Sequence, residues 1–219
     1  MYILHLSDIH YRRELGCRKK ADQGPLDGTN KKHGGVDRAA GPDGYQAMLS
    51  AMQNPLVFLD DCLDRVAGDW ERIGLVVITG DLTEDGTAED YRCLKHHIRK
   101  RIGDIPLVVT LGNHDNKRNF REGWLEEDAD SPCGLKEIGS APYNTIRRLE
   151  DTAVISFDTS VQGVPDGRMD DSQAAWLESV LKAEGKGPSI LVTHHHLLPE
   201  QGQIPPLPES RRLLSLLEH

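Results

Sequence analysis

The stretch Leu107–Asp115 reads LVVTLGNHD, a short apolar run that ends in a glycine and three polar residues. The apolar and β-branched residues at its start are typical of a buried strand. Gly112 lets the backbone turn sharply where that strand ends. Asn113, His114 and Asp115 then offer amide, imidazole and carboxylate groups. The stretch therefore predicts a strand that carries metal-capable side chains at its end.

The same pattern, an apolar strand running directly into polar side chains, occurs at three more places in the chain. The polar ends are Asp8 with His10, Asp81 after Gly80, and three consecutive histidines that begin at His194. In a parallel sheet the carboxyl ends of the strands meet along one edge, where α/β proteins bind their ligands. We therefore expect these residues, which are remote in sequence, to converge on one site.

Helical patterns alternate with the apolar runs, as in an α/β domain with mostly parallel strands. The expected strands are Tyr2–Leu6, Leu75–Thr79, Leu107–Leu111, Ala153–Phe157 and Ser189–Thr193. The expected helices are Pro55–Ala67, Ala88–Ile102 and Ser172–Ala183, the last with Ser172 as N-cap and with Ala175, Trp176, Leu177, Val180 and Leu181 facing inward. An adjacent pair of strands, Tyr143–Leu149 and Thr152–Phe157, is expected to turn at Glu150 and Asp151. A single domain over residues 1–219 accounts for the whole length.

Residues 11–44 differ from the rest of the chain, because they are rich in Gly, Asp and basic residues and lack apolar periodicity. This pattern predicts a long loop. A loop of that length inside a compact domain is usually functional or disordered, so a lid over the substrate and a disordered segment are both open interpretations. Arg12 follows His10 closely and is a candidate contact for a phosphate-bearing substrate.

The composition limits the partners. The 219 residues carry 35 acidic and 26 basic side chains, a formal net charge of -9, which argues against a nucleic-acid duplex or an anionic membrane as the main partner. No apolar run resembles a signal peptide or a membrane span. The four cysteines, at 17, 62, 93 and 133, lie far apart and form no C-x-x-C pair. This spacing indicates reduced thiols and no zinc knuckle or disulfide framework. We expect a cytoplasmic protein that acts on a small molecule, and its oligomeric state stays open.

The candidate ligands indicate a metal site. Asp8 and His10 are two residues apart, so their side chains point the same way in extended chain. With Asp81, Asn113 and His194 they form a mixed set of carboxylate, amide and imidazole ligands, which suits manganese, iron or zinc. A carboxylate such as Asp81 can bridge two ions. Two ions about 3.5–4 Å apart would clamp an in-line displacement at phosphorus, with a bridging hydroxide as nucleophile.

The motifs DxH at Asp8, GD at Gly80, GNHD at Gly112 and the histidines from His194 resemble, in this order, those of the calcineurin-like metallophosphoesterases. FDTS at Phe157, followed by SQxxWL, is similar to the bacterial class III cyclic-nucleotide phosphodiesterases and related glycerophosphodiesterases. The resemblance implies a four-layer α/β/β/α fold, a β-sandwich flanked by helices. It also implies hydrolysis of a small phosphate ester, preferably a diester, with two divalent metals.

The resemblance also implies a role for each residue of the site. It assigns one metal to Asp8 and His10, the bridge to Asp81, and the other metal to Asn113 and His194. His114 would lie over the phosphate and help to protonate the leaving oxygen, oriented by Asp115.

The histidines next to these ligands have simpler interpretations. His194 ends its strand and is therefore the expected ligand of the three. Strand alternation predicts that His195 points to the opposite face, and His196 is a candidate for the lining of the substrate pocket. His5 lies inside a strand and is expected to be a hydrogen-bonded structural residue.

One departure from the family pattern leaves each metal without one ligand, so we expect this chain to bind metals poorly and to turn over slowly. The family closes its site with a Gly-His-x-His motif some tens of residues after the histidine at 194, and this sequence lacks it. Residues 217–219 read LEH, like the start of a Leu-Glu-polyhistidine tail, so a C-terminally truncated protein is the preferred interpretation and a naturally degenerate member is the other. The main prediction is a metal-dependent phosphodiesterase. The alternatives are a catalytically weak binding or scaffold protein and a nuclease of the same superfamily.

Overall fold

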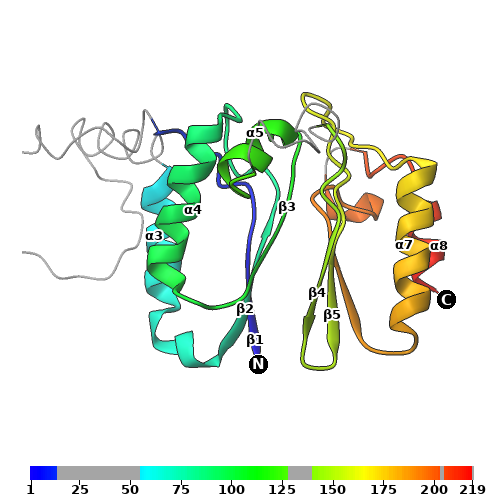
Figure 1. Ribbon diagram of the computed structural model, residues 1–219, viewed down its shortest axis with the longest axis horizontal. Coiled ribbons are helices and arrows are strands. Elements are labelled where there is room, and N and C mark those ends of the chain that lie inside the picture. The colour runs from blue at the N-terminus through cyan, green and yellow to red at the C-terminus, as the bar shows by residue number, and fades with distance from the viewer. Residues whose placement is uncertain (14–54, 128–139, 203–204, 219) are drawn as a thin grey trace, which may run out of the picture.

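The structure is a computed structural model that describes residues 1–13, 55–127, 140–202 and 205–218 (Figure 1). Its strands are β1 (Tyr2–Leu6), β2 (Ile73–Thr79), β3 (Leu107–Thr110), β4 (Thr145–Leu149), β5 (Thr152–Ser156) and β6 (Ser189–Val192). Its α-helices are α3 (Pro55–Arg65), α4 (Ala88–Ile102), α5 (Lys117–Gly123), α7 (Asp171–Glu184) and α8 (Ser210–Leu217). Short 3-10 helices cover Ala67–Arg72 and Pro199–Gln201. The expected strands and helices are therefore confirmed, with ends that shift by one or two residues.

The first sheet is parallel throughout, in the order β1-β2-β3. Leu6 pairs with Ile78, and Thr79 pairs with Thr110, so the three strands finish at the same level. This register brings the residues that follow each strand to one edge of the sheet. The predicted convergence of strand ends is thus a property of the fold.

The second sheet has the order β4-β5-β6 and is mixed. β4 and β5 form the expected antiparallel pair, in which Leu149 lies opposite Thr152 across the turn, and β6 runs parallel to β5. Because β5 and β6 are parallel, β6 also delivers its carboxyl end, and the residues after Val192, next to the end of β5.

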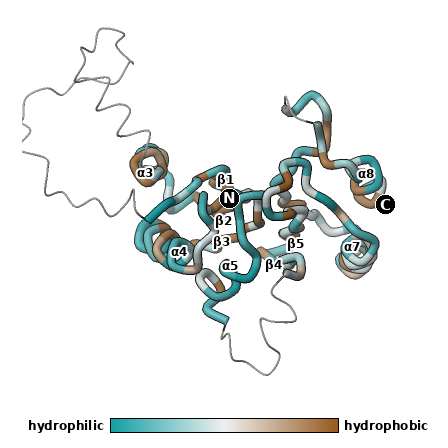
Figure 2. The backbone as a smooth tube through the Cα atoms, turned by 90° about the horizontal axis from the view of Figure 1, so that it is seen from above, coloured by the Kyte–Doolittle hydropathy of each residue, from teal (hydrophilic) through white to brown (hydrophobic). Residues whose placement is uncertain are grey.

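The two sheets pack face to face with helices on both outer sides (Figures 1 and 2). The core between the sheets consists of buried aliphatic side chains: Leu75, Val77, Val108, Val154 and Val192. Alternate residues of the same strands, such as Val76 and Ile78, face the helices α3 to α5 instead. Ile155 and Phe157 pack in the same way against α7 and α8. The four-layer α/β/β/α arrangement is confirmed.

Helix α7 corrects one prediction at its start. Its N-cap is Asp170, which accepts from Gln173 N, while the Gln173 side chain accepts from Asp170 N in a complete capping box. Ser172, the expected cap, lies inside the first turn and donates to the Asp170 carboxylate. Ala175 was expected to face inward but is exposed, and Ala174 is buried in its place.

Three further expectations concern the cysteines, the loop of residues 11–44 and membrane spans. Cys62 and Cys93 form no disulfide bond among the described residues, whereas Cys17 and Cys133 lie outside them, as do residues 14–44 of the expected loop. Tyr11, the first residue of that loop, is buried and bridges to Thr83. No helix in the described ranges is long and apolar enough to cross a membrane.

Candidate metal centre

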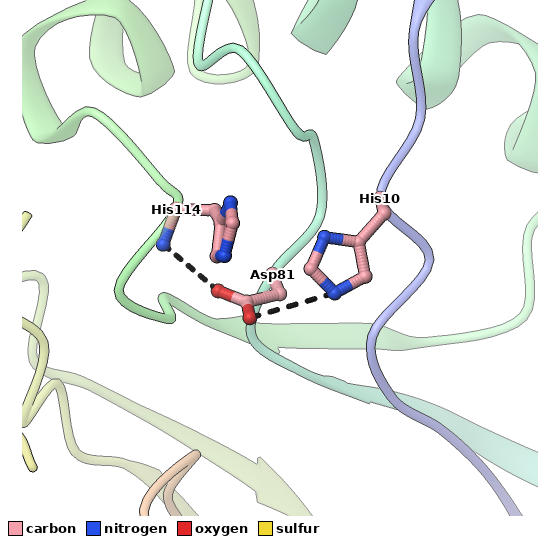
Figure 3. A group of neighbouring side chains, drawn as sticks. All are labelled: His10, Asp81 and His114. Carbon is pink, nitrogen blue, oxygen red and sulfur yellow. Dashed lines mark hydrogen bonds and ion pairs between the residues drawn. The ribbon is translucent and has the colours of Figure 1, made fainter. Parts of the chain in front are cut away.

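Asp81 lies at the centre of the polar edge, directly after β2. It is 4% exposed, and its Oδ2 lies 3.6 Å from His10 Nε2 and 3.7 Å from His194 Nε2. Its Oδ1 accepts a hydrogen bond from His114 N at 3.0 Å. Figure 3 shows the rings of His10 and His114 on either side of the Asp81 carboxylate. One buried carboxylate therefore faces groups from β1, β3 and β6.

Two sets of donor atoms share Asp81. In the first set, atoms of His10, Asp81 and His114 all lie within 4.8 Å of one another, and Asp8, Asp81 and His194 form the second set by the same measure. The two sets have only Asp81 in common. A carboxylate shared by two donor sets fits a pair of metal ions with Asp81 between them. The sets divide the other residues differently from the assignment expected from the sequence, because Asp8 groups with His194 and His114 groups with His10.

Asn113 lies in the same cavity as the second set. A cavity of about 330 Å³ is lined by Asp8, Asp81, Asn113 and the three histidines, together with Pro165 and Pro205. The Asn113 carbonyl accepts from Gly163 N at 2.8 Å, which fixes the turn that carries it. All five expected ligands are thus brought together by the fold.

The backbone is strained at the proposed ligands. Asp8, His10 and Asp81 have φ values of 54°, 49° and 47°, in the left-handed region that residues other than glycine rarely adopt. Each such residue costs on the order of 1 kcal/mol, and conformations of this kind are concentrated at functional sites. The fold thus holds these three side chains at the site at the cost of an unfavourable backbone conformation. With oxygen and nitrogen donors and no cysteine in either described set, the residues fit a borderline divalent cation.

His194 is oriented by the first sheet. Its Nδ1 lies 2.8 Å from the carbonyl oxygen of Thr79, the last residue of β2. A carbonyl oxygen only accepts, so Nδ1 carries the proton and Nε2 keeps its lone pair toward Asp81. His194 therefore presents a ligand-competent nitrogen from β6 across the sandwich.

His195 was expected to point away from His194, and the two rings have different partners: Thr159, after β5, for His195 and Thr79, in β2, for His194. Both residues nevertheless line the same cavity. β6 ends at Val192, so strand alternation no longer applies at the histidines. His195 is buried and its Nδ1 is 2.7 Å from Thr159 Oγ1. Its Nε2 has no hydrogen-bond partner among the residues the structure describes. Burial, followed by the neighbouring His194, lowers the pKa of His195 to about 4.

The other basic candidates have different outcomes. His196 lines the cavity as expected. Arg12, the candidate substrate contact, lies 3.2 Å from carboxylate oxygens of both Glu84 and Asp85, and its contact with a substrate stays a prediction. His5 is hydrogen-bonded to Thr79 Oγ1 at 2.8 Å, as expected for a structural histidine.

Asp115 does not contact the His114 ring, contrary to the orienting role expected for it. It is fully buried, and its two oxygens accept from Leu82 N, Thr83 N, Gly112 N and the Tyr91 hydroxyl. Burial raises the pKa of Asp115 to about 6, an effect that these donors oppose. Asp115 therefore connects the turns that carry the site.

The carboxylate beside the His114 ring belongs to Glu84, a residue that sequence reasoning missed. Its Oε2 is 3.4 Å from His114 Nδ1 and 2.7 Å from His10 Nδ1. Glu84 lies on the turn after β2, where no strand or helix pattern predicts the direction of a side chain. Its one sequence signal is its position three residues after Asp81.

Comparison with known proteins agrees with this geometry. A family model described as calcineurin-like phosphoesterase matches residues 1–218. A glycerophosphodiester phosphodiesterase, GpdQ, of Enterobacter lignolyticus is 28% identical over 225 residues, which cover 100% of this chain and 66% of the relative. A probable cyclic nucleotide phosphodiesterase of Rhodococcus erythropolis is 30% identical, covering 73% of this chain and 48% of the relative. A 3',5'-cyclic adenosine monophosphate phosphodiesterase, CpdA, of Escherichia coli K12 is 28% identical, covering 63% and 45%. The chain spans less than two thirds of the length of these relatives.

Proposed function

Because the chain belongs to the calcineurin-like phosphoesterase family, we propose that it hydrolyses a phosphodiester with the help of two divalent metal ions. The observation that carries this proposal is the pair of donor sets that share Asp81. A single carboxylate between two sets of nitrogen and oxygen donors is the arrangement that two-metal phosphoester hydrolysis uses. The names of the similar proteins, which are phosphodiesterases, support the diester.

Each residue has a proposed role. Asp8 and His10, whose Oδ1 and Nε2 atoms lie 3.9 Å apart, would hold one ion, and Asn113 and His194, which line one cavity, would hold the other, with Asp81 between them. Asp8 also groups with His194 around Asp81, so its carboxylate is within reach of both ions. When bound, the ions would neutralise charge on the phosphoryl oxygens and make water a nucleophile near neutral pH. Manganese, iron and zinc all suit this donor set.

His114 is the proposed general acid. Its side chain is 37% exposed, so its ring is open to the solvent side of the site, where a substrate would approach. A histidine placed at the leaving oxygen donates a proton to it as the ester bond breaks. The Nδ1 atom of the ring lies beside Glu84, which leaves Nε2 for the substrate or for a metal.

A larger cavity of about 780 Å³ supports a diester over a monoester. Its lining includes Asn116, two residues after His114, and basic residues from two segments: Lys117, Arg118 and Arg168. The loop that contributes Arg168 also contributes Pro165 to the metal cavity. We propose that this space accommodates the second ester group. A cytoplasmic location is part of the proposal, and it fits Cys62 and Cys93, which form no disulfide bond among the described residues.

The test compares a diester and a monoester model substrate with manganese. Bis(p-nitrophenyl) phosphate should be hydrolysed faster than p-nitrophenyl phosphate by the chain. His114→Ala should lower the diester rate by about 10²- to 10⁴-fold, the range for loss of a general acid. Asn113→Ala should weaken metal binding, and His96→Ala, on an exposed face of α4, serves as the control. Undiminished activity in both site variants would exclude this site, and no hydrolysis with metal bound would favour a scaffold.

A further inference from the structure

Glu84 faces two imidazole rings from the turn that follows β2. Its Oε2 lies 2.7 Å from His10 Nδ1 and 3.4 Å from His114 Nδ1. Its Oε1 accepts from Arg12 Nη2 at 3.2 Å. The side chain is only 29% exposed, so the carboxylate is largely shielded from water. A carboxylate that is shielded in this way loses solvation, so its place between two imidazole rings needs a functional explanation.

The backbone fixes Glu84 relative to His10. His10 N donates to Asp81 O at 2.9 Å, and Glu84 N donates to Tyr11 O at 3.1 Å. Tyr11 is buried and forms a parallel bridge with Thr83. The contact between carboxylate and imidazole therefore depends on a continuation of the β1-β2 pairing, which holds it in place before any ligand arrives.

We infer that Glu84 is a positioning residue, whose carboxylate accepts the Nδ1–H of His10 and so holds Nε2 as the ligand of a divalent cation, an inference that rests on the proposed function. Nε2 of His10 lies 3.6 Å from Asp81 Oδ2 and 3.9 Å from Asp8 Oδ1. A neutral imidazole carries its proton on one nitrogen only, so an acceptor at Nδ1 leaves the lone pair on Nε2. A carboxylate in this role also fixes the orientation of the ring.

The ring of His194 supports the same reading from the other side of Asp81. Its Nδ1 faces the Thr79 carbonyl at 2.8 Å, and its Nε2 faces Asp81 at 3.7 Å. Both rings therefore present Nε2 to the shared carboxylate and have an acceptor at Nδ1. Of these two rings, His10 has a charged acceptor and His194 a neutral one. Removing the acceptor is therefore expected to weaken metal binding more at His10.

Glu84 is not placed as a ligand itself. It contacts Nδ1 of His10, and the nitrogen that faces Asp81 is Nε2, on the other side of the ring. The same inference gives Arg12 a role, because its guanidinium neutralises the Glu84 carboxylate. Asp85, which also pairs with Arg12 but is 55% exposed, offers a matched control.

The first experiment reads the tautomer of His10 in the metal-free full chain by ¹⁵N NMR of the imidazole nitrogens. At about pH 8.5, where an ordinary imidazole is neutral, His10 should carry its proton on Nδ1. Glu84→Ala should redistribute the proton toward Nε2, and Asp85→Asn should leave it on Nδ1. A proton on Nε2 in the unmodified chain, or an unchanged tautomer in Glu84→Ala, would overturn the inference.

The second experiment titrates the metal-free variants with Mn²⁺ and measures the free ion by electron paramagnetic resonance. Glu84→Ala should weaken the tighter binding step by about 10- to 100-fold, as loss of an outer carboxylate does. Glu84→Gln should restore part of the affinity, because its amide oxygen still accepts from Nδ1–H. Asp85→Asn should bind as the unmodified chain does. Equal affinity in Glu84→Ala and the unmodified chain would overturn the inference, as would complete loss of one binding step, which marks Glu84 as a direct ligand.

His10→Ala separates this inference from the proposed function. If His10→Ala binds Mn²⁺ as tightly as the unmodified chain, the proposed metal centre is wrong and Glu84 has no cation to serve. If His10→Ala weakens binding and Glu84→Ala does not, only the role of Glu84 is wrong. Should Glu84→Ala fail to fold, Glu84→Gln with the tautomer measurement still tests the contact.

Discussion

The carboxylate of Asp115 connects three segments of the chain beneath the site. It accepts from Leu82 N and Thr83 N after β2, from Gly112 N after β3, and from the Tyr91 hydroxyl on α4. All these donors are buried, so each would be left without a partner if the carboxylate were lost. The position of Asp81 between two of these segments therefore depends on a residue that does not touch it.

We expect Asp115→Asn to destabilise the protein by about 3 kcal/mol, because the amide nitrogen would face backbone N–H donors in a buried position. Urea unfolding of the metal-free chain measures the change. Mn²⁺ affinity should also fall, since the turns of Asp81 and Asn113 lose their common anchor. Asp104→Asn, at an exposed position after α4, is the control. An unfolding free energy equal in Asp115→Asn and Asp104→Asn would contradict this role.

The metal candidates were predictable from the sequence, and their supporting residues were not. Asp8, Asp81 and His194 directly follow apolar runs, and parallel strands must bring such positions together. Glu84 lies in a turn whose direction is set by pairing between residues 11 and 83, a tertiary contact that local patterns do not contain.

The turn between β3 and α5 depends on a close approach at Gly112. A Cβ there would meet the Asp81 side chain and would lie 2.5 Å from the Asp81 backbone nitrogen. Both atoms belong to the residue shared by the two donor sets, so this contact has no flexible side chain that could move aside without changing the site.

Gly112→Ala is therefore expected to shift Asp81. Overpacking of this kind destabilises by about 2 kcal/mol, and we expect Mn²⁺ affinity to fall at least about 10-fold with it. Gly68→Ala, where a Cβ would meet nothing within 4 Å, should leave both quantities unchanged. Calorimetric titration and thermal unfolding of the two variants give the comparison, and equal metal affinities would count against the close approach.

The start of α7 offers a test at the same scale. Asp170 and Ser172 are both residue types that cap helices, which is why sequence alone chose the wrong one. The capping box with Gln173 distinguishes them, because it requires a spacing of three residues from the cap.

Asp170→Ala should destabilise the protein by about 1 kcal/mol, since the first turn loses an acceptor for a backbone N–H. Ser172→Ala should have a smaller effect, because the serine hydroxyl donates to Asp170 and accepts from no backbone N–H in the structure described. Urea unfolding distinguishes the two variants. A larger effect of Ser172→Ala would restore the original assignment of the cap.

At the scale of the whole molecule, the sequence predicted the strands and helices of each layer, but it did not predict which faces of the sheets contact each other. Alternation in β2 separates Val77 from Ile78, but it does not say which face meets helices and which meets another sheet. The structure places Val77 between the sheets and Ile78 against the helices. That choice depends on β5 and β6, whose Val154 and Val192 fill the same interface from far along the chain.

The site spans this interface, because His194 comes from the second sheet and the other proposed ligands come from the first. Polar bonds already cross the sandwich near it: Ser156 Oγ donates to Val109 O at 2.7 Å and Thr110 Oγ1 donates to Phe157 O at 3.3 Å. A cation bound by Asp81 and His194 would add another link between the sheets. Metal binding is therefore expected to stabilise the packing of the sheets as well as the site.

Adding Mn²⁺ at about 100 times its Kd should stabilise the folded chain by about 2.7 kcal/mol for one site, which raises Tm by roughly 5–10 °C in a protein of this size. His194→Ala should lose most of this shift, because it removes the ligand that the second sheet supplies. His96→Ala should keep all of it. Scanning calorimetry with and without chelator measures the three shifts. If His194→Ala shows the full rise, the ion is held by the first sheet alone and the sandwich has no part in the metal centre.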